Sequence, residues 1–230
     1  MNKLKKCMVL SDDFFLCSEG VHEAGEDTLF LVNNIDFSKS KKCLEIGVGM
    51  GIGTVYAKKR VENSWGIDIN RKAVECSIKN CFINDVSCDN IIVSDCFNGL
   101  SEKGFDIIFS NPPQLPTPPN LERMDEVGLA NNGGRYGRLI IDRIIDQCSE
   151  YLCIGGCLYL LHFDMCNIEE SVDKLRKYGF NVQIIATKKV SCGKLSFERI
   201  NYIKTFYDGI IHENNKYYYK MHILKAMKNI

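Results

Sequence analysis

The first half of the chain alternates between short apolar runs and longer stretches with helical spacing. Residues 71–84, for example, place Ala73, Val74, Ile78 and Phe82 at intervals that would put them on one face of a helix. Four apolar runs with the composition of buried strands flank such stretches: Cys43–Ile46, Trp65–Asn70, Asn90–Phe97 and Phe105–Ser110. This alternation predicts an α/β domain in which helices cover a parallel sheet.

The second half continues this alternation and then departs from it. Residues 139–152 carry isoleucines at helical spacing, and residues 191–215 are polar and weakly periodic. We therefore expect an inserted element near 192–212, ahead of a last strand at 216–227. The remaining expected elements are a hairpin or cap within Val9–Cys17, a strand at 157–163, a helix at 167–178 that Gly179 ends, and a strand at 180–190.

Composition limits the class of protein and the kinds of partner. The chain has 230 residues, 45% of them hydrophobic in type, which suits one soluble domain with a substantial core. The 29 basic and 29 acidic residues cancel, and this balance argues against a large nucleic-acid footprint. No apolar run reaches the length of a membrane span and no signal-peptide core follows the lysine-rich start, so we expect a cytoplasmic protein without membrane contact.

Cysteine is frequent, with twelve residues, but none are spaced C-x-x-C. Without a secretion signal, cysteines are usually reduced and pack as small apolar residues. We expect core cysteines and no metal site.

The stretch with the clearest chemistry is 43–57, where glycines stand at every second position: Gly47, Gly49, Gly51 and Gly53. Glycine lets the chain turn sharply and lets a ligand approach the main chain closely. The G-x-G-x-x-G spacing of dinucleotide sites is missing, because its third position would fall on Ile52 or Thr54. A nucleotide other than a dinucleotide is expected, and a glycine-rich turn without a ligand is the plainer alternative.

With Glu45 two positions ahead of Gly47, the pattern E-x-G-x-G-x-G resembles motif I of the class I S-adenosylmethionine-dependent methyltransferases. This resemblance implies a Rossmann-like fold, with a mostly parallel seven-stranded sheet, helices on both faces and an antiparallel strand near the C-terminus. It also implies that S-adenosylmethionine is the cofactor and that Glu45, Gly47, Gly49 and Gly51 contact it.

Two aspartates follow the next two apolar runs. Asp68 lies 17 residues beyond Gly51, which places it at the carboxyl end of the adjacent strand, within reach of a ribose diol. Asp95 could accept a hydrogen bond from an adenine amine while the N–H of Cys96 faces a ring nitrogen. We assign Asp68, Ile69, Asp95 and Cys96 to the cofactor. A helix cap at 68 and an unliganded loop aspartate at 95 are the alternatives.

The fourth apolar run leads directly into Asn111-Pro112-Pro113-Gln114. An amide nitrogen is planar and weakly nucleophilic, and two acceptors aimed at its N–H bonds would orient it for methyl transfer. The Asn111 side chain and the Pro112 carbonyl can supply those acceptors, while consecutive prolines preset the loop. The tetrapeptide resembles the N-P-P-[YFW] signature of amino-methyltransferases, with Gln114 in place of the aromatic residue. We assign all four residues to catalysis, Asn111 also to cofactor binding and Gln114 also to substrate binding.

A segment ahead of motif I resembles the V-Y-E-P-A-E-D-T signature of HemK-type glutamine methyltransferases. It matches at five positions and has His22 for Tyr and Ala24 for Pro. In that family the segment closes over the cofactor, which assigns Thr28 to cofactor binding. The matching residues are Val21, Glu23, Glu26, Asp27 and Thr28.

A glycine-rich stretch at 133–137 also resembles the one that follows N-P-P-Y in the HemK-type family. It brings Arg135 and Arg138 close to the expected site. Either arginine could bind a carboxylate or phosphate of the substrate, and a solvated loop is the alternative.

These features together predict a single methyltransferase domain over 1–230. Within it we expect an N-terminal cap at 1–40, a cofactor-binding core at 41–190 and a C-terminal extension at 191–230 that completes the sheet. The activity expected is N-methylation of a planar amide or amine in a protein or a small metabolite. Methylation of an exocyclic base amine in RNA or DNA, and a non-catalytic partner protein with this fold, are the alternatives.

Overall fold

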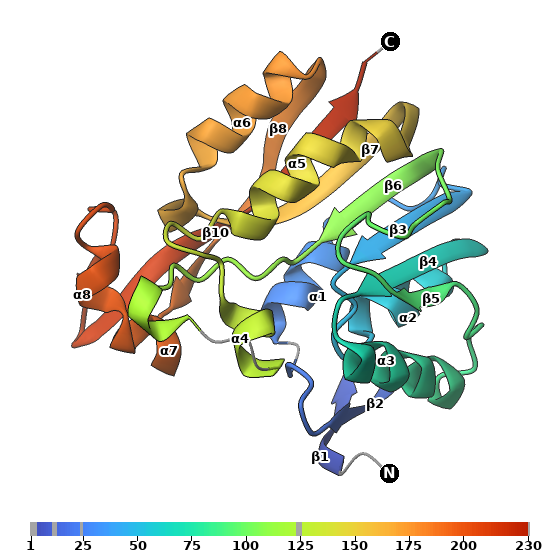
Figure 1. Ribbon diagram of the computed structural model, residues 1–230, viewed down its shortest axis with the longest axis horizontal. Coiled ribbons are helices and arrows are strands. Elements are labelled where there is room, and N and C mark those ends of the chain that lie inside the picture. Colours follow the sequence, from blue (N-terminus) through green and yellow to red (C-terminus); the bar gives the residue numbers. More distant parts are fainter. Residues whose placement is uncertain (1–3, 11–12, 24, 123–125, 230) are drawn as a thin grey trace.

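The computed structural model describes residues 4–10, 13–23, 25–122 and 126–229. Ala24, which takes the place of a family proline, lies outside these ranges. An eight-stranded sheet forms the centre of the molecule (Figure 1). Its strands are β3 (Lys42–Ile46), β4 (Asn63–Asp68), β5 (Ile91–Val93), β6 (Phe105–Ser110), β7 (Leu152–Phe163), β8 (Phe180–Ser191), β9 (Ile211–Glu213) and β10 (Lys216–Lys228).

The strand order is β5-β4-β3-β6-β7-β10-β8, and β9 pairs with the start of β10. The strands from β5 to β7 run parallel, and β10 lies antiparallel between β7 and β8. This order confirms the expected Rossmann-like arrangement, with the short β9 as an addition to the seven strands predicted. The carboxyl ends of β3, β4, β5 and β6 therefore share one edge, where ligands of such sheets bind.

Helices cover both faces of the sheet. Helices α5 (Leu139–Tyr151) and α6 (Ile168–Lys177) lie in front of the strands in Figure 1, whereas α1 and α2 lie behind them. The apolar side of α5 packs into the core through Ile141, Ile144 and Ile145, as its helical spacing predicts. The other helices are α1 (Glu26–Val32), α2 (Ile52–Lys58), α3 (Arg71–Ile83), α4 (Glu126–Asn131), α7 (Lys194–Glu198) and α8 (Ile200–Ile203), with 3-10 turns at Pro119–Leu121 and Asp164–Cys166.

The N-terminal segment forms the antiparallel hairpin β1 (Leu4–Leu10) and β2 (Asp13–Ser18). The expected hairpin at Val9–Cys17 is therefore present, although its connecting residues 11 and 12 lie outside the described ranges. Asn80 of α3 holds β2, because its side chain donates to the Leu16 carbonyl at 2.8 Å and accepts from the Leu16 N–H at 2.8 Å. The hairpin thus packs on α3.

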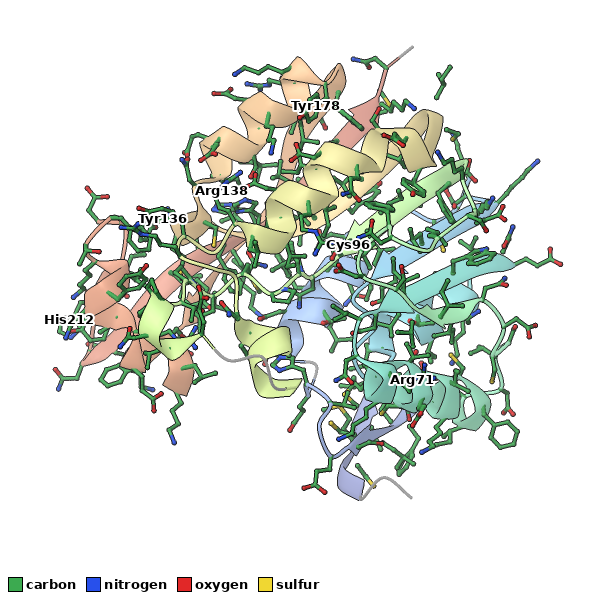
Figure 2. All side chains as sticks on the ribbon, viewed as in Figure 1. Arg71, Cys96, Tyr136, Arg138, Tyr178 and His212 are labelled. Atoms are coloured by element: carbon green, nitrogen blue, oxygen red, sulfur yellow. The ribbon has the colours of Figure 1, made fainter. Side chains whose placement is uncertain are left out.

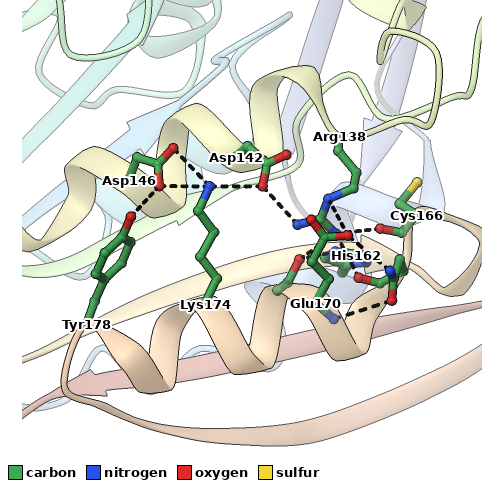
Figure 3. Close-up of polar contacts among 10 residues, drawn as sticks. Arg138, Asp142, Asp146, His162, Cys166, Glu170, Lys174 and Tyr178 are labelled. Carbon is green, nitrogen blue, oxygen red and sulfur yellow. Dashed lines mark hydrogen bonds and ion pairs between the residues drawn. The ribbon is translucent and has the colours of Figure 1, made fainter.

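A buried polar network joins α5, α6 and the end of β7 (Figure 3). Arg138 is 7% exposed and donates to the carbonyls of Cys166 and Asn167, both at 2.7 Å, and to Ser171 Oγ at 3.1 Å. The Ser171 hydroxyl hydrogen is then left for His162 Nε2 at 2.8 Å. Burial lowers the pKa of His162 to about 3, so this histidine is neutral and its Nδ1–H donates to the Phe163 carbonyl. Asp142 extends the network, because it accepts from Arg138 Nη2 at 2.8 Å and from Lys174 Nζ at 3.3 Å.

Replacing Arg138 by methionine tests how much this network contributes to the stability of the fold. The change leaves buried carbonyls without a donor, so we expect Arg138→Met to lower the free energy of unfolding by about 3 kcal/mol in urea titrations. Arg176→Met, on the exposed side of α6, is the matched control and should change it by less than about 0.5 kcal/mol. Equal losses in both variants would show that the buried network contributes little.

Candidate functional site

A cavity of about 340 Å³ opens at the carboxyl ends of the parallel strands. Such a volume is within the usual range of small-molecule sites. Its wall combines a glycine loop, carboxylates, the Asn111 loop and apolar side chains from several elements. The lining residues are His22, Gly25, Asp27, Thr28, Glu45, Ile46, Gly47, Val48, Gly49, Ile52, Ile67, Asp68, Ile69, Asn70, Ala73, Ser94, Asp95, Cys96, Ser110, Asn111, Pro112, Pro113, Gly128, Ala130, Asn132, Leu139, Ile140 and Arg143.

The glycine loop is held by hydrogen bonds to the end of β4. The N–H of Gly47 donates to the Ile67 carbonyl at 2.8 Å, and the N–H of Gly49 donates to Asp68 Oδ2 at 3.0 Å. A Cβ at Gly47 would have no heavy atom within 4 Å, which leaves the main chain open to a ligand. Gly47 and Gly49 thus form a bare surface over which a ligand could lie against the backbone.

Gly51 has a different function from the one expected. It caps α2 in a left-handed conformation with φ +92°, and a Cβ there would come within 2.6 Å of Ser77 Oγ on α3. Gly51 is absent from the cavity lining. A glycine is needed at position 51 because α2 and α3 approach each other closely there. The structure therefore gives Gly51 a structural role in place of the expected cofactor contact.

Glu45 lies beneath the loop and is 4% exposed. Thr54 Oγ1 donates to its carboxyl group, and Gly53 leaves the space the group fills, because a Cβ at that position would overlap Glu45 Oε1. Burial raises the pKa of Glu45 to about 8. The side chain is therefore largely protonated at neutral pH and supports the loop as a neutral hydrogen-bonding group.

Asp68 joins two segments at the cavity. Its Oδ1 accepts from the Asn70 N–H at 2.8 Å, while its Oδ2 holds Gly49. Burial raises the pKa of Asp68, and these two N–H donors oppose the rise. Asn70 takes the helix-cap role considered for Asp68, because its side chain accepts from the N–H of Lys72. The Asp68 carboxylate is left to face the cavity.

Asp95 has a partner that sequence patterns did not identify. Arg143 Nη1 of α5 donates to Asp95 Oδ1 at 2.8 Å, and this bond is the main cause that lowers the pKa of Asp95. Cys96, labelled in Figure 2, follows with a left-handed φ of +49°. Arg143 itself lines the cavity. It lies between the apolar positions of an amphipathic helix, where a surface arginine is common, so no local signal distinguished it.

Asn111 stands at the carboxyl end of β6, opposite the start of α1. Its Nδ2 donates to Thr28 Oγ1 at 3.3 Å, which leaves Oδ1 as the acceptor that can face a bound molecule. Pro112 and Pro113 continue the wall from the same loop. The α1 start and the N-P-P loop, more than eighty residues apart, are thus brought together at one side of the cavity.

Gln114 does not line the cavity, and its expected roles in catalysis and substrate binding are corrected. The side chain is 2% exposed and bridges to β7, with Nε2 donating to the Leu161 carbonyl at 3.1 Å and Oε1 accepting from the Phe163 N–H at 2.6 Å. An amide can satisfy both a donor and an acceptor at a strand end, which an aromatic ring cannot do. Gln114 therefore fastens the N-P-P loop to the sheet.

The two arginines of the glycine-rich stretch are also outside the cavity. Arg138 is buried in the network described above, where its hydrogen bonds are structural. Arg135 is exposed, with its guanidinium 5.2 Å from the centroid of the Tyr136 ring. The structure thus gives Arg138 a structural role in place of the expected substrate contact, whereas the substrate contact of the exposed Arg135 stays a prediction.

The cavity wall combines polar and apolar groups. Carboxylates stand at the end of β4 and beyond β5, the glycine loop exposes its backbone beside β4, and Ile52, Ile69 and Ile140 offer apolar surface. In the part of the chain that the structure describes, no group of three histidine, cysteine or acidic side chains could hold a metal ion. No helix among the described residues is long and apolar enough to cross a membrane.

Comparison with known proteins identifies relatives that align with more than two thirds of the chain. The family model described as methyltransferase small domain matches residues 17–117. A putative protein N5-glutamine methyltransferase of Methanocaldococcus jannaschii is 39% identical over 172 residues, covering 74% of this chain and 86% of that protein. The human methyltransferase HEMK2 is 28% identical over 171 residues, covering 69% and 79% of the respective chains.

A solved structure with the same fold is the E. cuniculi Mtq2–Trm112 complex, described as responsible for methylation of the eRF1 translation termination factor. It superposes with a TM-score of 0.62 at 22% identity, covering 91% of this chain and 99% of that one.

The protonation of Glu45 can be measured through stability. Its pKa lies near 4.5 when unfolded and about 8 when folded, so its contribution is fully present below pH 4.5 and is lost as pH rises through 8. Glu45→Gln stays neutral throughout. We expect the stability of the variant relative to wild type to increase by on the order of 3 kcal/mol between about pH 5.5 and 8.5. Urea titrations at both pH values measure this, and parallel pH profiles would contradict a protonated Glu45.

Proposed function

The chain belongs to the HemK-type group of S-adenosylmethionine-dependent methyltransferases, and from this membership we propose that it methylates the side-chain amide nitrogen of a protein glutamine. The observation that carries the proposal is the position of Asn111, whose Nδ2 is held by Thr28 Oγ1 so that Oδ1 can face an acceptor in the cavity. Relatives named release factor glutamine methyltransferase make a translation termination factor the first acceptor to try.

In this proposal the cofactor occupies the glycine-loop side of the cavity. Asp68 accepts hydrogen bonds from a ribose diol, Gly47 and Gly49 lie against the methionyl part, and Ile69 packs on the adenine. The N–H of Cys96 faces the ring, and Asp95, oriented by Arg143, accepts from the adenine amine. When bound, S-adenosylmethionine supplies an electrophilic methyl group.

The other side of the cavity receives the glutamine amide. Asn111 Oδ1 and the Pro112 carbonyl accept its two N–H hydrogens, which fixes the plane of the amide and aims the nitrogen lone pair at the methyl carbon. Pro112 and Pro113 have no N–H groups, so neither competes for these acceptors. Apolar wall residues such as Ile46 and Ile140 exclude water from the reacting atoms. The amide nitrogen would exchange one N–H proton for the methyl group, whose bond to the sulfonium sulfur breaks to leave a neutral thioether.

Replacing Asn111 tests the acceptor role. We expect Asn111→Ala to bind S-adenosylmethionine within about threefold of wild type, while turnover with a release factor falls about 100-fold or more, the scale of a lost transition-state hydrogen bond. Asn120→Ala, exposed on the same proline-rich segment, is the control. Labelled methyl transfer followed by peptide mass spectrometry identifies the modified residue. Since the E. cuniculi neighbour assembles with Trm112, the assay is run with and without a Trm112 protein.

Two outcomes would reject the assignment. Methyl transfer to RNA with none to protein would replace glutamine by a base amine as the acceptor. Turnover unchanged in Asn111→Ala would remove Asn111 from the mechanism while leaving the enzyme class intact.

The cofactor assignment has a separate test. Asp68→Asn keeps the size of the side chain but removes its charge, so we expect affinity for S-adenosylmethionine to fall about tenfold or more in calorimetric titration. Asp85→Asn is the matched control, because Asp85 is exposed on the loop after α3 and asparagine tolerates its positive φ of 54°. An affinity unaltered by Asp68→Asn would contradict the ribose role.

A further inference from the structure

The C-terminal insertion, defined here as residues 193–207 with α7 and α8, packs beside loops that border the cavity. Figure 1 shows α7 and α8 next to the green segment that includes the proline-rich loop. Figure 2 places Tyr136, of the glycine-rich stretch, toward the same part of the molecule. None of the lining residues of the cavity comes from the insertion. Its contacts are therefore with the loops and not with a ligand.

The proline-rich loop is poor in groups that could hold its own backbone. Five prolines occupy positions between 112 and 119, so only Gln114, Leu115 and Thr117 have N–H groups there. The carbonyls of such a loop need donors from elsewhere, because an unpaired buried carbonyl is costly. Thr117 is fully buried, at 0% exposure.

The glycine-rich stretch supplies some of the hydrogen-bond partners that the backbone of the proline-rich loop needs. The N–H of Thr117 donates to the Gly134 carbonyl at 2.9 Å, and the N–H of Gly133 donates to the Leu115 carbonyl at 3.1 Å. Gly133 must be glycine for this approach, because a Cβ would come within 2.7 Å of Gln114 Cα. The two loops thus form one paired unit, which we call the paired loops (residues 114–119 and 132–137).

The insertion holds both halves of the paired loops. Arg199 Nη1 donates to Thr117 Oγ1 at 2.6 Å and lies 3.4 Å from the Pro116 carbonyl. On the other half, the Tyr202 hydroxyl donates to the Arg135 carbonyl at 2.9 Å. The Phe206 ring lies edge-on to both Tyr202 and Tyr136, at 5.5 and 5.2 Å between centroids. Two side chains three residues apart on the insertion therefore hold both loops.

The paired loops continue directly into the cavity wall at two points. The first half, 114–119, directly follows Pro112 and Pro113 of the cavity wall. The second half, 132–137, directly follows α4, whose Gly128 and Ala130 also line the cavity. Gln114 already fastens the first point to β7. Asn132, the first residue of the second half, itself lines the cavity, so a shift of the paired loops would move part of the cavity wall.

We propose that Arg199, together with Tyr202, is a positioning residue for the acceptor side of the cavity. By holding the paired loops, the insertion fixes the position of the α4 wall, against which the methyl acceptor binds. The inference rests on the proposed function, because the acceptor is the substrate whose binding this wall would govern. Among the described residues, the side-chain hydrogen bonds of Arg199 and Tyr202 go to the paired loops and not to the cofactor side, which is built on β3 to β5.

The test separates acceptor binding from cofactor binding and from folding. Arg199→Ala removes both hydrogen bonds to the proline-rich half, and Tyr202→Phe removes a single hydroxyl. Asn201→Ala, exposed between them on α8, is the matched control. For each variant we would measure the KM for the protein acceptor, kcat, the affinity for S-adenosylmethionine, and amide hydrogen exchange over 114–119 and 132–137.

We expect Arg199→Ala to raise the KM for the acceptor about tenfold and Tyr202→Phe about threefold, with kcat changed less than KM. Cofactor affinity should stay within about twofold, and exchange at 114–119 and 132–137 should increase at least tenfold. Thr117→Val removes the oxygen that Arg199 binds, so the double variant with Arg199→Ala should have a KM no higher than the Arg199→Ala variant.

Several results would overturn the inference. One is an unchanged KM with unchanged exchange, and another is a fall in cofactor affinity equal to the change in KM, which would indicate general destabilisation. If Arg199→Ala does not fold, Arg199→Lys and Tyr202→Phe provide the same comparison. If wild type methylates no protein glutamine, the proposed function fails, while the exchange and cofactor measurements still decide whether the insertion holds the loops.

Discussion

The junction between the glycine loop and the end of β4 is the constraint on which the cavity depends. Two main-chain N–H groups of the loop donate to Ile67, and a third donates to Asp68. Through these bonds the loop after β3 is placed over the neighbouring strand, and the Asp68 carboxylate is oriented by the loop that it supports. Glu45 supports the loop from below as a buried, largely protonated acid. Because the parallel strands end at one edge, the groups that follow β5 and β6 reach the same cavity.

The acceptor side is held by a second set of buried polar contacts that has little to do with ligand binding. Gln114 joins the N-P-P loop to the end of β7, and Arg138 joins the start of α5 to the segment after β7. Both side chains are of types that often contact substrates. Within the fold, however, both ends of the Gln114 amide are hydrogen-bonded, and Arg138 donates through Nη1 and Nη2. This explains how the chain can lack the family's aromatic residue after N-P-P and still keep the loop in place. Asn111 and Asp27, by contrast, line the cavity.

Much of the fold could be predicted because it follows from local pattern. Strands β3, β4 and β6 and helices α3 and α5 begin and end within a few residues of their expected bounds, since burial period, caps and glycines act within one element. The spacing of motifs along an alternating β-α chain also placed Asp68, Asp95 and Asn111 at one sheet edge, because parallel strands share their direction. The bounds of β5 were less accurate: it ends at Val93, and Asp95 belongs to the following turn.

What the sequence by itself determined was thus the mostly parallel sheet and the backbone positions at the cavity. Only the tertiary structure decided which polar side chains face the cavity and which are buried elsewhere. Gln114 and Arg138 were assigned to the substrate by residue type, and packing against β7 and α6 gave them structural roles instead. Arg143 binds Asp95, which lies 48 residues away in the sequence, and Arg199 binds Thr117, which lies 82 residues away. Such pairings depend on how separate elements pack in space, and neither the period of a helix nor the spacing of a motif carries that information.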